Sequence, residues 1–271
     1  MPSYKWKCNH NEKPPVRICI SENLRLLVPH SQDELELMYF FEATGSEYFI
    51  SGMKIPFESD SLLIVNPHEL HGCDYWGKVC RAVCVIIDLK KLNALPLLNL
   101  KFRNKISNNE SVREIFNELS SLLCKSISEA ELLCHVNSLI FGLLSIISRE
   151  AETGYEINDR EKEINEVIAF VEENLSYNIT ADAMAEKMHL SKDRFFHVFR
   201  EFTGFSPGEY LLKCRMEKGC SLLKNTKLKI SEIAQECGFC TSSYFTERFF
   251  QIYNTTPSAY RKGEAEKDAL R

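Results

Sequence analysis

The sequence lacks a hydrophobic run approaching the roughly 20 residues that a membrane-spanning helix needs, and its first residues carry no apolar signal-peptide core. Glycine and proline are few, 11 and 9 among 271 residues, which excludes collagen-like repeats. Hydrophobic residues make up 44% and charged residues 26% of the chain, so wholesale disorder is excluded and about two folded domains are expected. We expect a cytoplasmic protein with no membrane segment.

Paired cysteine motifs are almost absent, although 11 cysteines are present. The count is odd, and most cysteines lie among apolar residues, so reduced buried thiols are favoured over a disulfide framework. Cys237 and Cys240 form the single CxxC motif, which is weak support for zinc or redox chemistry without a second pair.

The net charge of −5 hides an uneven distribution. From Lys187 to Lys262, 13 Lys and Arg residues stand against 7 Asp and Glu residues, whereas the rest of the chain is strongly acidic. A basic segment on an acidic protein indicates that one domain binds a polyanion.

The first half changes from strand-like to helix-like patterns. Short β-branched and aromatic runs between glycines and prolines predict a small barrel or sandwich; they include Leu24–Val28, Glu36–Phe41, Tyr48–Ile50 and Leu62–Val65. From Glu110 to Ser148 the helical period predicts a hairpin of two helices with a break near Ser126–Ser128. The wide apolar stripe of its second helix would pack on the barrel or, as we favour, on a second copy of the chain.

The polar stretch Glu150–Arg160 is the best linker in the chain. We therefore assign residues 1–150 to an N-terminal domain with the helical hairpin, 151–160 to a linker, 161–263 to a helical domain and 264–271 to a charged tail.

The helical domain contains an internal repeat of 50 residues. Phe195 and Phe245, Phe199 and Phe249, and Pro207 and Pro257 are matched pairs; Tyr210 and Tyr260 follow the same spacing. Such an ordered set of matches indicates two copies of one structural unit.

Each copy has the parts of a helix-turn-helix unit. In the first, Thr180 caps a helix over Ala181–Met188 and Ser191 caps a second helix over Lys192–Thr203. In the second, a helix over Ser231–Glu236 is followed by a turn in which Gly238 supplies a positive φ. Thr241 or Ser242 then caps a helix that ends at Tyr253.

In each unit, the apolar stripe of the second helix is expected to face the core. The opposite face of that helix is then free to contact base edges in a major groove. With nearby basic residues, these faces give our candidate DNA contacts: Lys192, Asp193, Phe196, His197, Arg200, Lys213, Arg215, Ser242, Ser243, Thr246 and Glu247. The helical stretch Pro207–Lys224 between the copies would be about 27 Å long, close to the roughly 34 Å between successive major grooves on one DNA face.

These residues resemble the AraC family of bacterial transcription regulators. The resemblance rests on Ile179–Tyr210, with Leu190, Ser191, Gly204 and Pro207, and on Ile230–Arg261, with Gly238, Phe239 and Pro257. It implies an all-α domain of two helix-turn-helix units joined by a long helix, binding to double-stranded DNA, and promoter activation with RNA polymerase. Phe250, Gln251 and Glu247 stand where the family often has basic residues, so we expect weaker phosphate contacts in the second unit.

The first half is similar to the cupin-like β-barrel that senses effectors in this family, on the motif Asn66–His71. The resemblance makes His30, Glu36, Met38, Phe40 and His71 candidate lining residues of an effector pocket. Three interpretations remain open for His30, Glu36 and His71: they line an organic effector pocket, they form the metal site of a cupin enzyme, or they are purely structural. Because Gln32 stands near the place of an expected histidine, we favour a small organic effector with no metal and no cofactor.

The sequence therefore predicts an α+β, two-domain DNA-binding regulator that is not an enzyme and that forms a homodimer. The alternatives are a cupin metal enzyme fused to a DNA-binding module and a regulator controlled by a protein partner.

Overall fold

The computed structural model describes residues 3–5, 14–22, 26–44, 46–74, 80–125, 127–154 and 156–263. The contacts divide the chain into two compact units, Met1–Lys162 and Glu163–Arg271, and each unit is described by itself. The expected strand residues at 24 and 25 and the charged tail at 264–271 lie outside the described residues.

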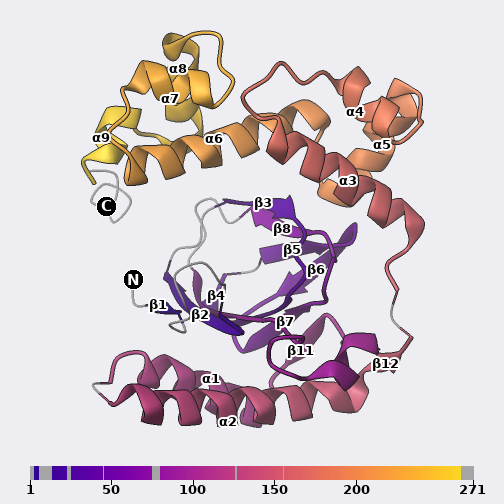
Figure 1. Ribbon diagram of the computed structural model, residues 1–271, viewed down its shortest axis with the longest axis vertical. Coiled ribbons are helices and arrows are strands. Elements are labelled where there is room, and N and C mark those ends of the chain that lie inside the picture. Colours follow the sequence, from indigo (N-terminus) through magenta and orange to yellow (C-terminus); the bar gives the residue numbers. More distant parts are fainter. Residues whose placement is uncertain are drawn as a thin grey trace. The chain divides into compact units, whose positions relative to one another are not determined.

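Two antiparallel sheets form most of the N-terminal unit (Figure 1). The six-stranded sheet contains, in spatial order, β1 (Ser3–Lys5), β2 (Val16–Glu22), β9 (Cys80–Ile87), β4 (Leu35–Ala43), β7 (Ser61–Val65) and β11 (Lys105–Ser107). The four-stranded sheet contains β3 (Leu26–His30), β8 (His71–Asp74), β5 (Ser46–Ile50) and β6 (Met53–Phe57). Four of these strands, β3, β4, β5 and β7, overlap the runs named from the sequence; closure of the two sheets into one barrel stays a prediction.

A short ladder also joins β10 (Leu100–Lys101) to β12 (Glu152–Thr153). The latter strand lies in the segment that the sequence assigns to a linker. Both residues are exposed, as a polar composition indicates, but such a composition does not exclude the pairing of two residues with another short strand.

The residues of β4 alternate between two cores, as the period of a strand requires. Leu37 and Tyr39 belong to a core that the six-stranded sheet shares with helices, whereas Met38 and Phe40 belong to a core between the two sheets. The core between the sheets also holds Tyr48, Ile50, Phe57, Leu63, Val65, Cys73, Ala82 and Cys84. The six-stranded sheet is therefore covered on both faces.

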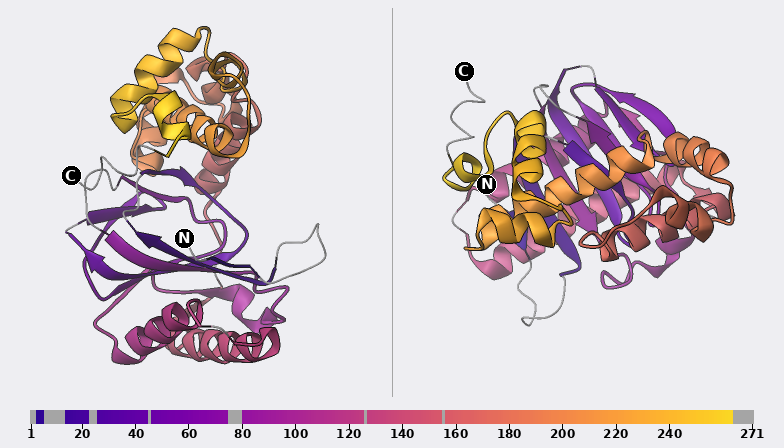
Figure 2. Two further views of the ribbon diagram at one scale, coloured as in Figure 1. Left: turned by 90° about the vertical axis from the view of Figure 1, so that its left-hand side faces the viewer. Right: turned by 90° about the horizontal axis from the view of Figure 1, so that it is seen from above.

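The predicted helical hairpin consists of α1 (Glu110–Leu122) and α2 (Glu129–Ile147), which lie side by side along one face of the six-stranded sheet (Figures 1 and 2). Asn109 and Ser128 cap their N-termini. Tyr39 stacks on Phe116 of α1, with ring centroids 4.9 Å apart, which ties the sheet to the hairpin. The 3₁₀ turns η1 (Leu95–Asn99) and η2 (Ser148–Glu150) complete this unit.

The stretch Glu129–Glu150 is long and apolar enough to cross a membrane, by length and composition alone. This corrects the expectation that the chain has no such run. The stretch contains a few polar residues, but its mean hydropathy is still 1.8, high enough for a membrane-spanning helix. Core helices meet the same criterion, and one face of α2 does lie in the core through Val136, Ile140 and Leu143.

The C-terminal unit is helical throughout its described residues, as the sequence predicts. Its elements are α3 (Asp159–Glu173), α4 (Ala181–Lys187), α5 (Lys192–Thr203), α6 (Pro207–Asn225), α7 (Ile230–Glu236), α8 (Ser242–Tyr253) and α9 (Pro257–Arg261). The boundary of the units falls within α3, after Lys162. Figures 1 and 2 show α6 running between the α4–α5 pair and the group α7–α9.

Candidate DNA-binding surface and ligand cluster

The first helix-turn-helix unit is formed by α4 and α5, with the caps that the sequence predicts. Thr180 Oγ1 accepts a hydrogen bond from the Ala183 amide, and Ser191 Oγ accepts one from the Arg194 amide. The turn between the helices passes through His189, whose φ is +52°. These caps satisfy amides that a helix start leaves without partners, so they fix where each helix begins.

The outer face of α5 carries the predicted residues Asp193, Phe196, His197 and Arg200, all of them exposed. Its inner face buries Phe195, Val198 and Phe199 in the core of the unit. Lys192 forms an exposed ion pair with Asp182 of α4 at 3.0 Å. Such a pair contributes little to stability, so the ammonium group can exchange this partner for a phosphate.

The second unit, α7 and α8, repeats this arrangement. Thr241 caps α8 by accepting a hydrogen bond from the Tyr244 amide, and Phe245 and Phe249 are buried as Phe195 and Phe199 are in the first unit. The turn contains Gly238 with φ +76°, as predicted. The start of α7 differs from the prediction: it begins at Ile230, because Glu232 accepts a hydrogen bond from the backbone amide of residue 229.

Among the predicted contacts on α8, Ser243 and Glu247 are exposed, and Ser242 and Thr246 are partly exposed. A chain of hydrogen bonds crosses the surface of this helix. Glu247 accepts one from Gln251, Gln251 accepts one from Arg248, and Arg248 also donates to the Tyr244 hydroxyl. The sequence analysis did not select Tyr244, which lies one helical turn before Glu247, or Arg248, which follows Glu247 directly.

The two basic residues selected on α6 differ in their surroundings. Lys213 places its ammonium group 4.7 Å from the centroid of the Phe205 ring. Arg215 instead donates to the carbonyl oxygens of Leu175 and Tyr177, at 3.1 and 2.8 Å. These bonds link the segment after α3 to α6, an internal role that charge patterning alone does not show; a DNA contact by Arg215 stays a prediction from the sequence.

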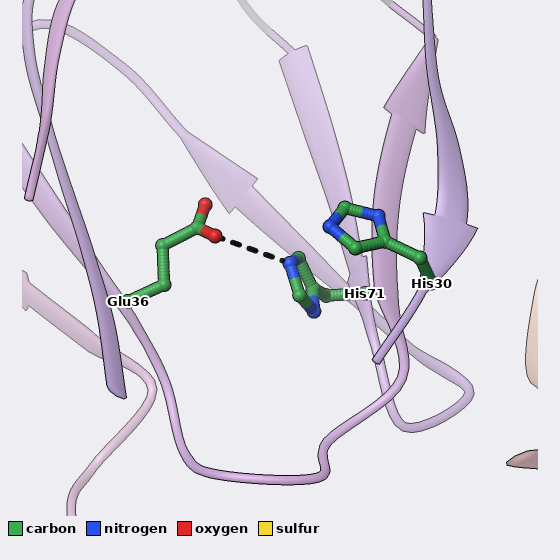
Figure 3. Close-up of side chains that lie close together, drawn as sticks. All are labelled: His30, Glu36 and His71. Atoms are coloured by element: carbon green, nitrogen blue, oxygen red, sulfur yellow. Dashed lines mark ion pairs between the residues drawn. The ribbon is translucent and has the colours of Figure 1, made fainter. Parts of the chain in front are cut away.

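The N-terminal unit brings together the three predicted polar residues His30, Glu36 and His71 (Figure 3). One ligand atom of each lies within 4.8 Å of the others. His30 and His71 are paired across β3 and β8, with ring centroids 4.3 Å apart, and Glu36 reaches them from β4 of the other sheet. The cluster therefore joins both sheets beside their shared core, which contains the predicted lining residues Met38 and Phe40.

The ionisation of the cluster follows from burial and mutual charge. Burial raises the pKa of Glu36, but hydrogen bonding and charge from His71 outweigh it, and the pKa lies below its ordinary value. Burial likewise lowers the pKa of His71, yet the Glu36 carboxylate brings it above the ordinary value. The pKa of His30 is lowered, first by burial and then by the charge of His71. These shifts favour the charged forms of Glu36 and His71 and the neutral form of His30.

A second polar network holds the loop before His71. The Glu69 carboxylate accepts hydrogen bonds from the backbone and side chain of Asn66 and from the side chain of Asn104. The Asn66 side-chain amide donates a hydrogen bond to the carbonyl oxygen of Phe102 and accepts one from the Phe102 backbone amide. Because these buried groups are satisfied, the loop is fixed, and with it the position of the His71 imidazole.

Comparison with known proteins gives three results. The helix-turn-helix domain family matches residues 184–263. The HTH-type transcriptional activator RhaS of Escherichia coli (strain SE11) is 22% identical over 243 residues, which cover 86% of this chain and 87% of RhaS. Two structures of ToxT from Vibrio cholerae share the fold: an apo variant from strain SCE256 (TM-score 0.54, 13% identity, 92% of this chain and 97% of that chain) and the O395 protein (TM-score 0.51, 14% identity, 91% and 97%).

The chain is an AraC-type transcription regulator. The C-terminal unit of this AraC-type protein is its DNA-binding domain, and its N-terminal sheets form the second domain of a ToxT-like, two-domain fold. The protein belongs to a family of regulators and not of enzymes, which removes the cupin-enzyme alternative.

Proposed function

We propose that this protein activates transcription by placing α5 and α8 in adjacent major grooves of double-stranded DNA and contacting RNA polymerase at the promoter. The observation that carries the proposal is the repeated unit, with one capped, outward-facing helix near each end of α6. The 19 residues of α6 span about 28 Å, close to one turn of DNA. RhaS, similar over most of both chains, is an activator by name.

The proposed base contacts come from exposed or partly exposed polar side chains: Asp193, His197, Arg200, Ser242, Ser243, Thr246 and Glu247. Lys192 and Lys213 are proposed to contact phosphates, and the exposed rings of Phe196 and Phe250 are suited to thymine methyl groups. We leave Arg215 out of this set because two carbonyl oxygens hold its guanidinium.

The N-terminal unit is proposed to sense a small organic molecule in the cytoplasm. The core between the sheets supplies apolar residues, including Met38 and Phe40, and the cluster of His30, Glu36 and His71 supplies polar groups. Sites of this composition suit small ligands, because apolar walls give affinity and a few fixed polar groups give orientation.

The protein is further proposed to act as a homodimer through α2. No Asp, Glu, Lys or Arg stands between Glu131 and Arg149. Only 28% of the apolar stretch of this helix is buried, and the face turned away from the sheet includes Cys134, Ser138, Phe141 and Ser145, all exposed. An uncharged helical face of this length is suited to pack against a second copy of itself.

The proposal is tested with the full chain and a pool of random duplexes. We expect the selected sites to contain two short conserved blocks about 10 base pairs apart, and footprinting should show protection on one face of the DNA. Transcription by purified bacterial RNA polymerase from a promoter carrying such a site should rise when the protein is added. Folded protein that selects no sequence, or that only lowers transcription, would contradict the proposal.

A further inference from the structure

The histidines of the cluster are oriented as metal ligands are. His30 Nδ1 lies 3.0 Å from the carbonyl oxygen of Val28, and His71 Nδ1 lies 3.0 Å from that of Glu69. A carbonyl oxygen only accepts hydrogen bonds, so each Nδ1 carries a proton. In the neutral form of each ring the lone pair is then on Nε2, which is the arrangement that outer-shell carbonyls impose on metal-binding histidines.

Glu36 is oriented in the same way. Gln32 donates a hydrogen bond to Glu36 Oε2 at 3.0 Å, and the thiol of Cys84 also hydrogen-bonds the carboxylate. Each of the three donor side chains is therefore held by an outer partner. Gln32, which stands near the place of an expected histidine ligand, thus orients the carboxylate by its hydrogen bond.

His71 Nε2 is the buried nitrogen that faces the Glu36 carboxylate. The side chain is fully buried, and among the described residues no well-directed hydrogen bond reaches this nitrogen. It lies 3.4 Å from Glu36 Oε2, with which it forms an ion pair when Nε2 is protonated (Figure 3), and a divalent cation between the two atoms would take the place of that proton. Two ligands of a tetrahedral zinc ion, at about 2.0–2.2 Å from the metal, are separated by about 3.4 Å.

From this geometry we infer that His30, Glu36 and His71 bind one divalent transition-metal ion of the zinc and iron class. Two imidazoles with one carboxylate form the donor set of several zinc sites and of non-haem iron sites. The site bridges the two sheets, so the ion would link β3 and β8 to β4. The inference rests on the proposed sensing function, and it adds that the sensing site binds a divalent transition-metal ion.

Three protein donors leave at least one coordination position open. An oxygen or nitrogen atom of the organic effector would occupy that position, with its apolar part against the neighbouring core residues. The organic ligand proposed above is thereby kept, and the inference adds a metal ion to it where the sequence favours none.

The experiment uses the full chain without an affinity tag. After treatment with a chelator and removal of the chelator, the protein is dialysed against Zn²⁺ or Co²⁺, and the bound metal is measured by elemental analysis. We expect one equivalent of either ion, with a visible cobalt spectrum of low coordination number. Elemental analysis of untreated protein, purified under anaerobic conditions, distinguishes zinc from iron as the native ion.

Three variants test the ligands and one serves as a control. Glu36→Gln and His30→Ala should each weaken metal binding at least about tenfold, and His71→Gln more, since a lost ligand costs no less than a lost outer partner. His68→Asn is the matched control: His68 is exposed, three residues from His71, and has φ +67°, which asparagine tolerates. We expect its metal affinity to be unchanged.

The inference is overturned if the folded protein binds no stoichiometric metal, or if Glu36→Gln and His30→Ala bind it as the original chain does. It is also overturned if Cys240→Ser alone removes the metal, since the ion would then belong to the CxxC motif, in which Cys237 is buried and Cys240 is exposed. DNA binding is measured on every preparation. Metal binding without any DNA binding would contradict the proposed function and leave the metal site standing.

Discussion

A Cβ atom built on Gly238 would lie 2.2 Å from the carbonyl oxygen of Leu175 and 2.8 Å from a guanidinium nitrogen of Arg215. The turn of the second helix-turn-helix unit therefore lies directly against the segment that follows α3. Arg215 bonds the same carbonyl, so one contact region joins the end of α3, the middle of α6 and the turn before α8.

Replacement of Gly238 by alanine should destabilise the C-terminal unit. The positive φ alone costs about 1–3 kcal/mol for a residue with a side chain, and the clash with Leu175 adds to this. Thermal unfolding of the full chain should show an earlier transition for this unit. Gly208→Ala is the control, because a Cβ there meets nothing within 4 Å and the position is helical. Equal melting of the two variants would contradict the prediction.

Arg215→Ala should lower the melting temperature without changing the salt dependence of DNA binding. The loss of two hydrogen bonds to carbonyl oxygens destabilises the junction after α3, while no phosphate contact is lost. A decrease in the slope of log affinity against log salt would show instead that this side chain neutralises a phosphate.

Lys213→Ala should weaken binding to all DNA sequences alike. Removal of one phosphate contact changes the salt slope by about 0.9 and leaves base preference unaltered. The measurement is a salt titration by fluorescence anisotropy. Lys213→Arg, which keeps both the charge and the contact with the Phe205 ring, should retain the original slope.

His197→Ala should change the preferred bases within one of the two recognised blocks. An exposed side chain at the centre of the outer face of α5 is placed for a base contact, and each such contact contributes about 1–3 kcal/mol of discrimination. Selection from random duplexes measures this directly. Glu173→Ala, exposed on α3 outside both helix-turn-helix units, should select the original site, and an unchanged site for His197→Ala would remove this residue from the reading face.

Phe141→Lys should convert the dimer into a monomer while the N-terminal unit stays folded. The ring is 49% exposed in the single chain, so a charge is tolerated there but is costly inside a dimer interface. Sedimentation equilibrium reports the change, and Glu118→Lys on the exposed face of α1 is the control. Phe141 is chosen over Leu143 of the same helix. Leu143 is fully buried, so a charge there would unfold the unit; a Phe141→Lys variant that remains dimeric would place the interface elsewhere.

Much of the C-terminal unit could be predicted because its determinants are local. Thr180, Ser191 and Thr241 each cap the helix that follows them, and the phenylalanine stripes decide which faces are buried. The start of α7 was misplaced by one residue, since Glu232 bonds the amide at position 229 and the cap needs no serine or threonine.

The features that the sequence did not reveal depend on contacts between distant segments. The partner of Arg215 lies 40 residues away, and the pairing of β12 with β10 joins residues more than 50 positions apart. The convergence of His30, Glu36 and His71 was anticipated from the motif at Asn66–His71. The orientation of their ring nitrogens was not, because it depends on which carbonyl oxygens lie beside each ring.

The alternation along β4 imposes a rule on how this protein can evolve. Glu36 and Met38 serve the cluster and the core between the sheets, while Leu37 and Tyr39 serve the hairpin. Insertion or deletion of one residue in this strand would exchange the two sets, placing a carboxylate against α1 and α2 and leucine against the imidazoles. Changes in sensing specificity must therefore arise by point substitution within the strand, and natural variation in length is expected in the loops at its ends.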